Sequence, residues 1–410
     1  GMTGTVARAI EPVMILLLIG ALTGAWTVSG IIPAMVYYGV EFVNPSALLP
    51  ATVVVCSLIS VVTGSSWTTV ATVGVAIAGI GEAFGLNSGM VAGAIISGAY
   101  FGDKLSPLSD TTNLAAAVAG TNLFTHIRYM IYTTLPAWVA TLIIFSIIGP
   151  YAAGETETAA TETIRVAIAS NFNVNPLLLA APALLVAVIV KRTPAVPAMI
   201  AGTALGLASA VIFQSELMHT ISSQPEYDNL YKTLIKAVSG EFSAVGTQSE
   251  IASLASSSGM TGMLGTVFLI VAAMIFGGAM ESSGCLETIT NAIRSLIKGR
   301  VSLILCTLLS GVIFNLTACD QYLSIVVPGR MLSPLYDLNK YSPEVLSRAL
   351  EDSATVTSPL IPWNSCGATQ SKILAITVAH YLPYCFFNML SPVFNILETV
   401  CNYKIRRRKN

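Results

Sequence analysis

Residues 101–115 read Phe-Gly-Asp-Lys-Leu-Ser-Pro-Leu-Ser-Asp-Thr-Thr-Asn-Leu-Ala. The stretch places three charged side chains, Asp103, Lys104 and Asp110, and a proline among five hydroxyl or amide side chains, although the flanking sequence is strongly apolar. A charge at the centre of a bilayer costs roughly 2.5–3.5 kcal/mol on insertion scales. Because such a cost persists only where the charges face protein, water or a ligand, the stretch predicts a site that holds a charged solute within a membrane.

The composition predicts a membrane protein. Of the 410 residues, 54% are hydrophobic and 10% are charged, and the mean hydropathy is +0.74. Soluble domains carry about 25% charged residues, so we expect an all-α, polytopic protein with the lipid bilayer around it. The net charge of −1 argues against a nucleic-acid partner. The seven cysteines are scattered and the histidines show no ligand spacing, so no cofactor is expected. Hydrolase and metalloprotease motifs such as G-x-S-x-G and H-E-x-x-H are absent from the sequence, so we predict no enzyme.

Apolar segments of about 20 residues mark spanning helices. We expect six such helices, at 10–29, 129–149, 174–190, 194–213, 262–282 and 379–400. Two longer apolar segments, 88–122 and 342–378, contain polar runs with proline and predict broken helices. Two more, 46–81 and 301–336, have polar centres, and halves of about 15 residues are too short to cross a bilayer. We therefore expect two re-entrant hairpins, since non-helical backbone at membrane depth must line a cavity or pack against protein.

The two halves of the chain resemble each other. Thr63-Gly64-Ser65-Ser66 and Ser106-Pro107-Leu108 correspond to Thr317-Ala318-Cys319-Asp320 and Ser358-Pro359-Leu360, about 250 residues apart, which predicts a duplication. The second half then contains five crossings, an odd number, so the repeats have inverted topology. We expect four segments, namely a first repeat at 1–150 that lacks its two N-terminal helices, an extracytoplasmic linker at 151–173, a complete second repeat at 174–400 and a basic tail at 401–410.

Basic residues predict the orientation of the chain. With the tail in the cytoplasm, counting backward through the expected crossings places most lysines and arginines on the cytoplasmic side, as the positive-inside rule requires. The sequence thus predicts a multi-pass protein of the cell (inner) membrane with a cytoplasmic C-terminal tail. The two hairpins then enter from opposite sides, and their tips converge near Asp103 and Lys104.

Hard oxygen ligands gather at the four polar interruptions, as a Na⁺ site needs. The candidate site residues are Asp103, Lys104, Ser106, Ser109, Asp110, Thr112 and Asn113 in the first broken helix, Ser65, Ser66 and Thr68 at the first hairpin tip, Asn315, Thr317 and Asp320 at the second tip, and Thr357, Asn364 and Ser365 in the second broken helix. Asp103, Asp110 and Asp320 are the Na⁺ candidates. Glu351 and Asp352 are candidates for a gate or a proton relay.

Each of these residues also has a structural interpretation. Asp103 and Lys104 could form a buried pair that only fastens the helix bundle. Asp110 and Asp320 could be helix N-caps, and serine or threonine hydroxyls often bond back to their own helix. The sequence leaves these alternatives open.

The segments 98–115, 63–69 (Thr-Gly-Ser-Ser-Trp-Thr-Thr) and 359–367 (Pro-Leu-Ile-Pro-Trp-Asn-Ser-Cys-Gly) resemble those of NhaC-type Na⁺/H⁺ antiporters. The resemblance implies a bacterial or archaeal inner-membrane location and Na⁺/H⁺ exchange. The wider superfamily has paired re-entrant hairpins and broken helices, and members normally have further N-terminal helices. The family also contains exchangers that couple Na⁺ or H⁺ to small carboxylates such as malate and lactate.

The leading hypothesis is therefore Na⁺/H⁺ antiport by alternating access, in which Asp103, Asp110 and Asp320 bind either Na⁺ or a proton. Lys104 either keeps Asp103 ionised or itself releases a proton when Na⁺ arrives. A Na⁺- or H⁺-coupled exchanger of a small carboxylate is the alternative, and a passive channel is a remote one. The oligomeric state stays open, a homodimer included.

Overall fold

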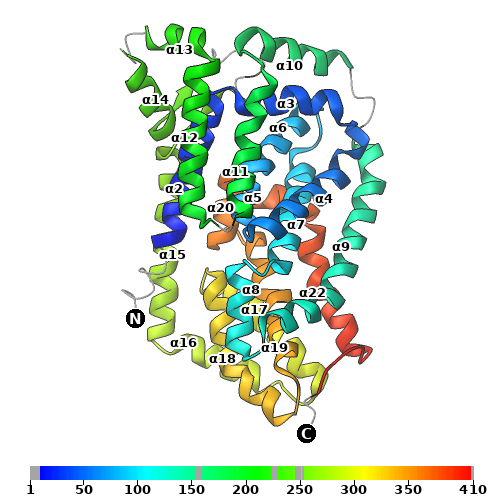
Figure 1. Cartoon of the computed structure of the whole chain (residues 1–410). Helices are drawn as coiled ribbons and strands as arrows, with labels where there is room; N and C mark the ends of the chain where they lie inside the picture. The colour runs from blue at the N-terminus through cyan, green and yellow to red at the C-terminus, as the bar shows by residue number, and fades with distance from the viewer. Residues whose placement is uncertain are drawn as a thin grey trace.

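The structure is a computed structural model that describes residues 10–153, 158–191, 193–223, 229–244, 251 and 254–407. Residues 1–9 of the predicted first repeat, 154–157 of the linker and 408–410 of the basic tail lie outside this part of the chain. Helices make up nearly all of the described structure (Figure 1). Its one described sheet is a short antiparallel pair, β1 (Phe242–Ser243) with β2 (Ser256–Ser257). The all-α prediction is confirmed.

The helices of the first half run in the order α2 (Ile10–Val28), α3 (Ile31–Phe42), α4 (Pro45–Thr63), α5 (Ser66–Thr69), π-helix η1 (Val70–Gly74), α6 (Val75–Ala83), α7 (Ser88–Leu105), α8 (Asp110–Ala119) and α9 (Leu123–Ala153). Those that follow, up to the second hairpin, are α10 (Thr158–Asn171), η2 (Pro176–Leu179), α11 (Ala180–Val190), α12 (Ala195–Phe213), α13 (Ser215–Ser222), α14 (Leu230–Ser239), η3 (Thr261–Met263), α15 (Leu264–Ser282) and α16 (Cys285–Arg294). The last are α17 (Arg300–Thr317), α18 (Gln321–Leu338), α19 (Pro343–Leu350), π-helix η4 (Glu351–Thr355), η5 (Ser358–Leu360), α20 (Ser365–Ile373), α21 (Val378–Tyr381), η6 (Leu382–Tyr384) and α22 (Phe386–Val400).

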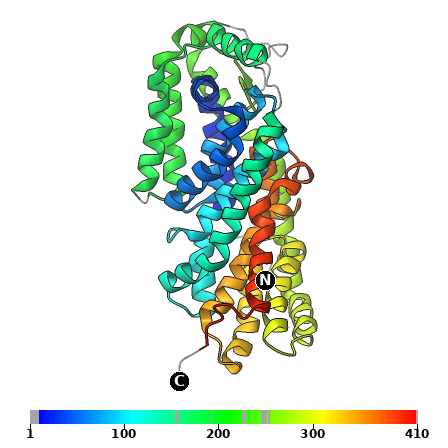
Figure 2. The same ribbon diagram turned by 90° about the vertical axis from the view of Figure 1, so that its right-hand side faces the viewer.

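These helices form an elongated bundle. Helices α3, α10, α13 and α14 lie at one end of its long axis, and α16, α18, α19 and the C-terminus lie at the other (Figures 1 and 2). Five described helices are long and apolar enough to cross a membrane, and two bent pairs, α2 with α3 and α10 with α11, bring the number up to seven. The chain is a multi-pass membrane protein.

Helix α9 shows how this fold meets lipid. Ile131, Leu135, Val139 and Ile143 follow one another at four-residue spacing and are 40%, 44%, 43% and 54% exposed. Residues four apart share one face of a helix. An exposed face of this kind is unfavourable in water and favourable against acyl chains.

Two sequence expectations need correction. The span expected at 379–400 is not one helix, because Pro383 lies in the 3₁₀ turn η6 between α21 and α22 and cannot supply a helical N–H. The hairpin arms are longer than expected, at 19 residues for α4 and 18 each for α17 and α18. Since a helix of 18 residues is about 27 Å long, the length of these arms gives no support to the prediction that they are re-entrant.

Both predicted helix breaks are present. Residues 106–109, with Pro107, separate α7 from α8. In the second half the helix α19 widens into η4 and stops at η5, and α20 begins only at Ser365. A proline at each break removes a backbone donor and stops the helical ladder.

Close packing holds α7 in place. A Cβ on Gly98 would lie 2.6 Å from the carbonyl oxygen of Val53 on α4, and Gly102 meets Ser57 in the same way one turn later. Ser60 of α4 donates a 2.6 Å hydrogen bond to the carbonyl oxygen of Ala99. The absence of side chains on these two glycines lets α4 and α7 touch backbone to backbone and fixes the end of α7 that carries Asp103 and Lys104.

Candidate functional site

Asp103 lies against the turn between α4 and α5, which is the tip of the predicted first hairpin. Its Oδ2 accepts hydrogen bonds from the Ser66 hydroxyl at 2.7 Å and the Ser66 backbone N–H at 3.2 Å. The chain turns sharply at Gly64, whose φ of +69° suits glycine, and Ser65 caps α5 by accepting from the Thr68 N–H at 3.2 Å. Oδ1 of Asp103 accepts no hydrogen bond among the described residues, and the side chain is only 7% exposed. The hydroxyl of Thr68 is also buried without a partner there.

The first break is organised by serine and threonine. Ser109 caps α8 by accepting from the Thr112 N–H at 3.4 Å, and Ser106 accepts from the Leu108 N–H at 3.2 Å. The Thr112 hydroxyl donates to the Lys104 carbonyl oxygen at 3.1 Å, so this freed carbonyl already has a donor. Asp110 is not the cap; it is the first residue of α8 and is exposed.

Asn113 also lies on the exposed side of α8, where its amide donates to the carbonyl oxygens of Pro107 and Ser109 at 3.0 and 2.7 Å. Asp103, Asp110 and Asp320 do not form one ligand group, since no cluster of three acidic, histidine or cysteine side chains suited to a metal ion occurs in the described chain. The assignment of Na⁺ binding to Asp103, Asp110 and Asp320 stays a prediction.

Lys104 pairs with Asp352 of the second half and not with Asp103. Successive helical residues point about 100° apart, so Asp103 faces the hairpin tip while Lys104 faces η4. Both members of the pair are fully buried.

Three further polar side chains surround the pair. Ser391 bonds Lys104 at 2.9 Å and Asp352 at 2.8 Å. Asn395 donates to Asp352 Oδ2 at 2.6 Å and Thr133 donates to its Oδ1 at 3.3 Å. We call Lys104, Asp352, Ser391, Asn395 and Thr133 the buried-pair network. It ties α7, η4, α22 and α9 together with nearly every polar atom satisfied.

The second hairpin tip contacts the second break in the same manner as the first tip contacts Asp103. Asn315 donates to the Ala354 carbonyl oxygen at 2.7 Å and the Thr357 hydroxyl at 3.0 Å. Asn364 donates to the side chain of Asn315 at 3.2 Å, and the Ser365 N–H donates to the Cys319 carbonyl oxygen at 3.0 Å. The structure therefore brings Asn315, Thr357, Asn364 and Ser365 together.

Two residues of the second tip serve their own helices. Asp320 is the N-cap of α18 and accepts from the Leu323 N–H at 2.9 Å. The Thr317 hydroxyl donates to the Ile313 carbonyl oxygen of the same helix at 2.8 Å. Asp320 as a helix N-cap and Thr317 as a hydroxyl bonded to its own helix match the structural interpretations given above.

Glu351 is fully buried, and neither of its carboxylate oxygens has a hydrogen-bond partner in the described chain. Other buried polar groups without partners among the described residues include the hydroxyls of Ser97, Tyr100, Thr355 and Thr369 and both ends of the Gln370 amide. Buried polar groups are normally paired. Unpaired polar groups inside a membrane protein are candidates for binding an ion or a proton.

Sequence reasoning missed Tyr100, Gln370 and the polar residues of α22. A signal existed for the last group. Asn388, Ser391 and Asn395 recur at spacings of three and four residues, which puts them on one face of an otherwise apolar helix. That face meets η4.

The chain was also compared with known proteins. The sequence model of the "Na+/H+ antiporter family" matches residues 98–402. A "Na(+)/H(+) antiporter NhaC" from Alkalihalophilus pseudofirmus is 35% identical over 95% of this chain and 81% of its own length. Another protein with that description, from Bacillus subtilis, is 35% identical over 97% of this chain and 85% of its own. A "Malate-2H(+)/Na(+)-lactate antiporter" from Bacillus subtilis is 33% identical over 94% of this chain and 80% of its own.

Proposed function

The chain belongs to the Na⁺/H⁺ antiporter family, and on that premise we propose that it exchanges Na⁺ for H⁺ across the cell membrane by alternating access. The carrying observation is Asp103, a buried carboxylate at a helix break, with one oxygen held by Ser66 and the other without a hydrogen bond in the described chain. Such a group can exchange protein donors for an ion at small structural cost.

Na⁺ binds at Asp103 in this proposal. Oδ1 and Oδ2 of Asp103 and the hydroxyls of Ser66 and Thr68 are hard oxygen ligands close to one hairpin tip. Ion binding at Oδ2 displaces the two Ser66 hydrogen bonds, so the tip moves when the ion arrives. Asp110 and Asp320 lie outside this ligand set and contribute negative potential to the ion's path.

Glu351 carries the proton. Its carboxyl group makes no hydrogen bond in the described chain, so gaining or losing a proton breaks no contact. Asp352, the next residue, is committed to Lys104 and three hydrogen-bond donors. We assign the relay to Glu351 and an anchoring role to Asp352.

The two repeats are inverted in this proposal, with boundaries at 1–150 and 174–400 around the linker 151–173, and each hairpin enters the membrane from one side. The similar tip-to-break contacts in both halves, Ser66 to Asp103 and Asn315 to Thr357, support the duplication. The basic tail, 401–410, faces the cytoplasm. No enzymatic step and no cofactor are needed, because competition of Na⁺ and H⁺ for carboxylates produces exchange.

Proteoliposomes with an entrapped pH dye test the function. An imposed Na⁺ gradient should drive a pH change, and Asp103→Asn should abolish it. Asp337→Asn, which removes an exposed carboxylate of α18, is the matched control. Full exchange by Asp103→Asn would end the site assignment. A proton flux that stays the same when an opposing Na⁺ gradient is imposed would indicate a passive channel.

Coupling to a carboxylate is the second candidate function. One of the relatives described above carries malate and lactate in its name. A cavity between α15 and α20, lined by Lys372 and described below, favours it in this chain.

A further inference from the structure

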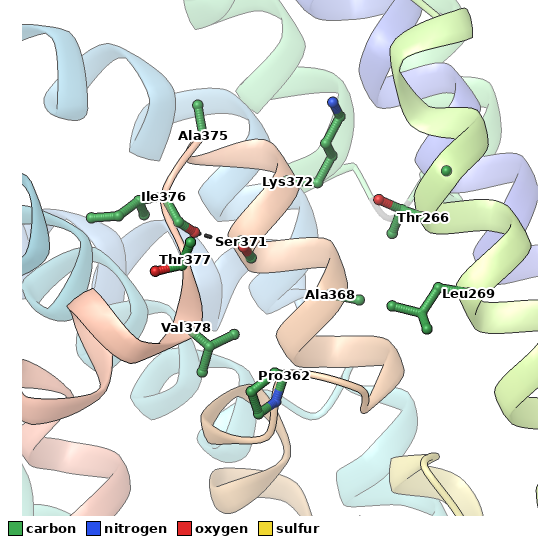
Figure 3. Close-up of a pocket in the computed structure, with 11 residues that line it drawn as sticks. Thr266, Leu269, Pro362, Ala368, Ser371, Lys372, Ala375, Ile376, Thr377 and Val378 are labelled. Carbon is green, nitrogen blue, oxygen red and sulfur yellow. Dashed lines mark hydrogen bonds between the residues drawn. The ribbon is translucent and has the colours of Figure 1, made fainter.

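A cavity of about 520 Å³ lies between α15 and α20, outside the contacts described so far. Gly265, Thr266 and Leu269 of α15 form one wall, and Ala368, Ser371 and Lys372 of α20 form the other (Figure 3). Pro362 closes one side, two residues before Asn364 of the second break. The volume is within the range of small-molecule sites, and one wall belongs to the same helix break as the candidate ion site.

Lys372 gives the cavity its charge. The residue is half-buried, and its ammonium group makes no ion pair or hydrogen bond among the described residues. It lies about 10 Å along α20 from the break, given the 1.5 Å rise per residue. Figure 3 shows its side chain extending from α20 beside Thr266 of α15. A cation at this position repels Na⁺ and attracts an anion.

Thr266 supplies a second free polar group. It is 9% exposed, and its hydroxyl takes part in no hydrogen bond within the described chain. The hydroxyls of Ser371 and Thr377 are engaged, with the Ile376 carbonyl oxygen at 2.6 Å and with His380 Nδ1 at 2.8 Å. Leu269, Ala368 and Val378 make the remaining surface apolar. One cation, one hydroxyl and an apolar wall match a small organic acid.

We propose that this cavity is a binding subsite for a small organic carboxylate, with Lys372 as its counter-ion and Thr266 as a hydrogen-bond donor. The inference rests on the proposed exchange function and adds a substrate class to it. A carboxylate held by Lys372 and Thr266 packs against α20, the helix that begins at the second break, which links its binding to the position of that helix. Ammonium–carboxylate pairing is stronger in a half-buried site than in water.

The experiment uses the whole chain in phosphatidylcholine vesicles and two readouts. One is Na⁺-driven proton flux without organic acid, and the other is uptake of ¹⁴C-labelled L-lactate or L-malate against a Na⁺ or proton gradient. We expect uptake of at least one acid by the unmodified chain. Lys372→Gln should lower the ratio of acid uptake to proton flux by about ten-fold or more, the effect of one lost charged contact, and Lys372→Arg should retain most of it.

Two further variants keep the test independent of folding. Lys298→Gln removes an exposed lysine and should leave the ratio at its original value. Leu269→Trp, which adds bulk to the opposite wall of the cavity and leaves Lys372 in the sequence, should lower the ratio as Lys372→Gln does.

The possible failures are distinguishable. Proton flux without uptake of either acid overturns this inference and leaves the proposed function standing. Unchanged acid uptake in Lys372→Gln also overturns it, and indicates a lysine that only reaches the lipid headgroups. Absence of both activities overturns the exchange function together with the inference that rests on it.

Discussion

Asp103 and Lys104 are neighbours in the sequence but belong to two different environments. Lys104 is locked into the buried-pair network, where Asp352 receives hydrogen bonds from Ser391, Asn395 and Thr133. Asp103 receives two hydrogen bonds from Ser66, and the Ser109 hydroxyl is a further polar neighbour of its carboxylate. A saturated network is expensive to disturb and holds helices together. A sparsely bonded carboxylate is the one that can change partners.

The largest expected effect comes from breaking the saturated pair. Asp352→Asn leaves Lys104 buried without a counter-ion, which should cost roughly 3–5 kcal/mol of stability. Thermal unfolding of the purified protein in detergent measures the loss. The double variant Lys104→Met with Asp352→Leu should be more stable than Asp352→Asn, because no unpaired charge remains. If Asp352→Asn unfolds at the same temperature as the unmodified chain, the Lys104–Asp352 pair does not stabilise the fold, and the proposed difference between the two environments is wrong.

Asn395→Leu should have the next largest effect. It removes the 2.6 Å hydrogen bond to Asp352 Oδ2 and should cost about 1.5–3 kcal/mol, as for a bond to a charged group. Combined with Asp352→Leu, the same substitution should cost much less, because the two residues act through one contact. Equal costs in both backgrounds would show that Asn395 acts through packing.

Ser66→Ala tests the environment of Asp103, the carboxylate with few hydrogen bonds. Asp103 keeps the Ser66 backbone N–H, so stability should fall by only about 1 kcal/mol, while the Na⁺ concentration that gives half-maximal exchange rises. Ser66→Thr preserves the hydroxyl and is the control. If Ser66→Ala destabilises the chain as much as Asp352→Asn and leaves the Na⁺ dependence unchanged, Ser66 has a structural role and does not bind Na⁺.

Glu351→Gln should change stability least. Its oxygens have no hydrogen-bond partner in the described chain to lose, and the new amide has nearly the same shape, so we expect a change smaller than the loss of one hydrogen bond, about 1 kcal/mol. Na⁺-driven proton flux should nevertheless fall to the level of empty vesicles. Flux equal to that of the unmodified chain would exclude Glu351 as the proton carrier.

Local chemistry explains what could be predicted from the sequence. Apolar length predicted most spanning helices, and proline with hydroxyl residues predicted both breaks, because these features act within one or two turns of chain. The same local reasoning failed for Pro383, whose effect on the span at 379–400 was overlooked. It also understated the hairpin arms, since the helical hydrogen bonds of α4 and α17 continue up to the polar tips.

Long-range partners were harder to predict. Lys104 was expected to act on Asp103, its neighbour, yet it reaches Asp352, 248 positions away. Helical geometry explains why adjacent residues diverge, but choosing among Asp103, Asp110, Asp320, Glu351 and Asp352 as the partner requires knowing how α7 and η4 pack. The cavity beside Lys372 likewise forms from two helices, α15 and α20, that are far apart in sequence.

The sequence by itself therefore determined a multi-pass helical membrane protein with costly polar interruptions and an inventory of carboxylates, because hydrophobicity and backbone breaks are properties of short segments. The tertiary structure decided which charges are neutralised and which remain available. It did so because pairing depends on the rotation and contact of helices that only the fold brings together. In that fold Asp352 pairs with Lys104, while Asp103 and Glu351 keep oxygens that no donor in the described part of the chain reaches.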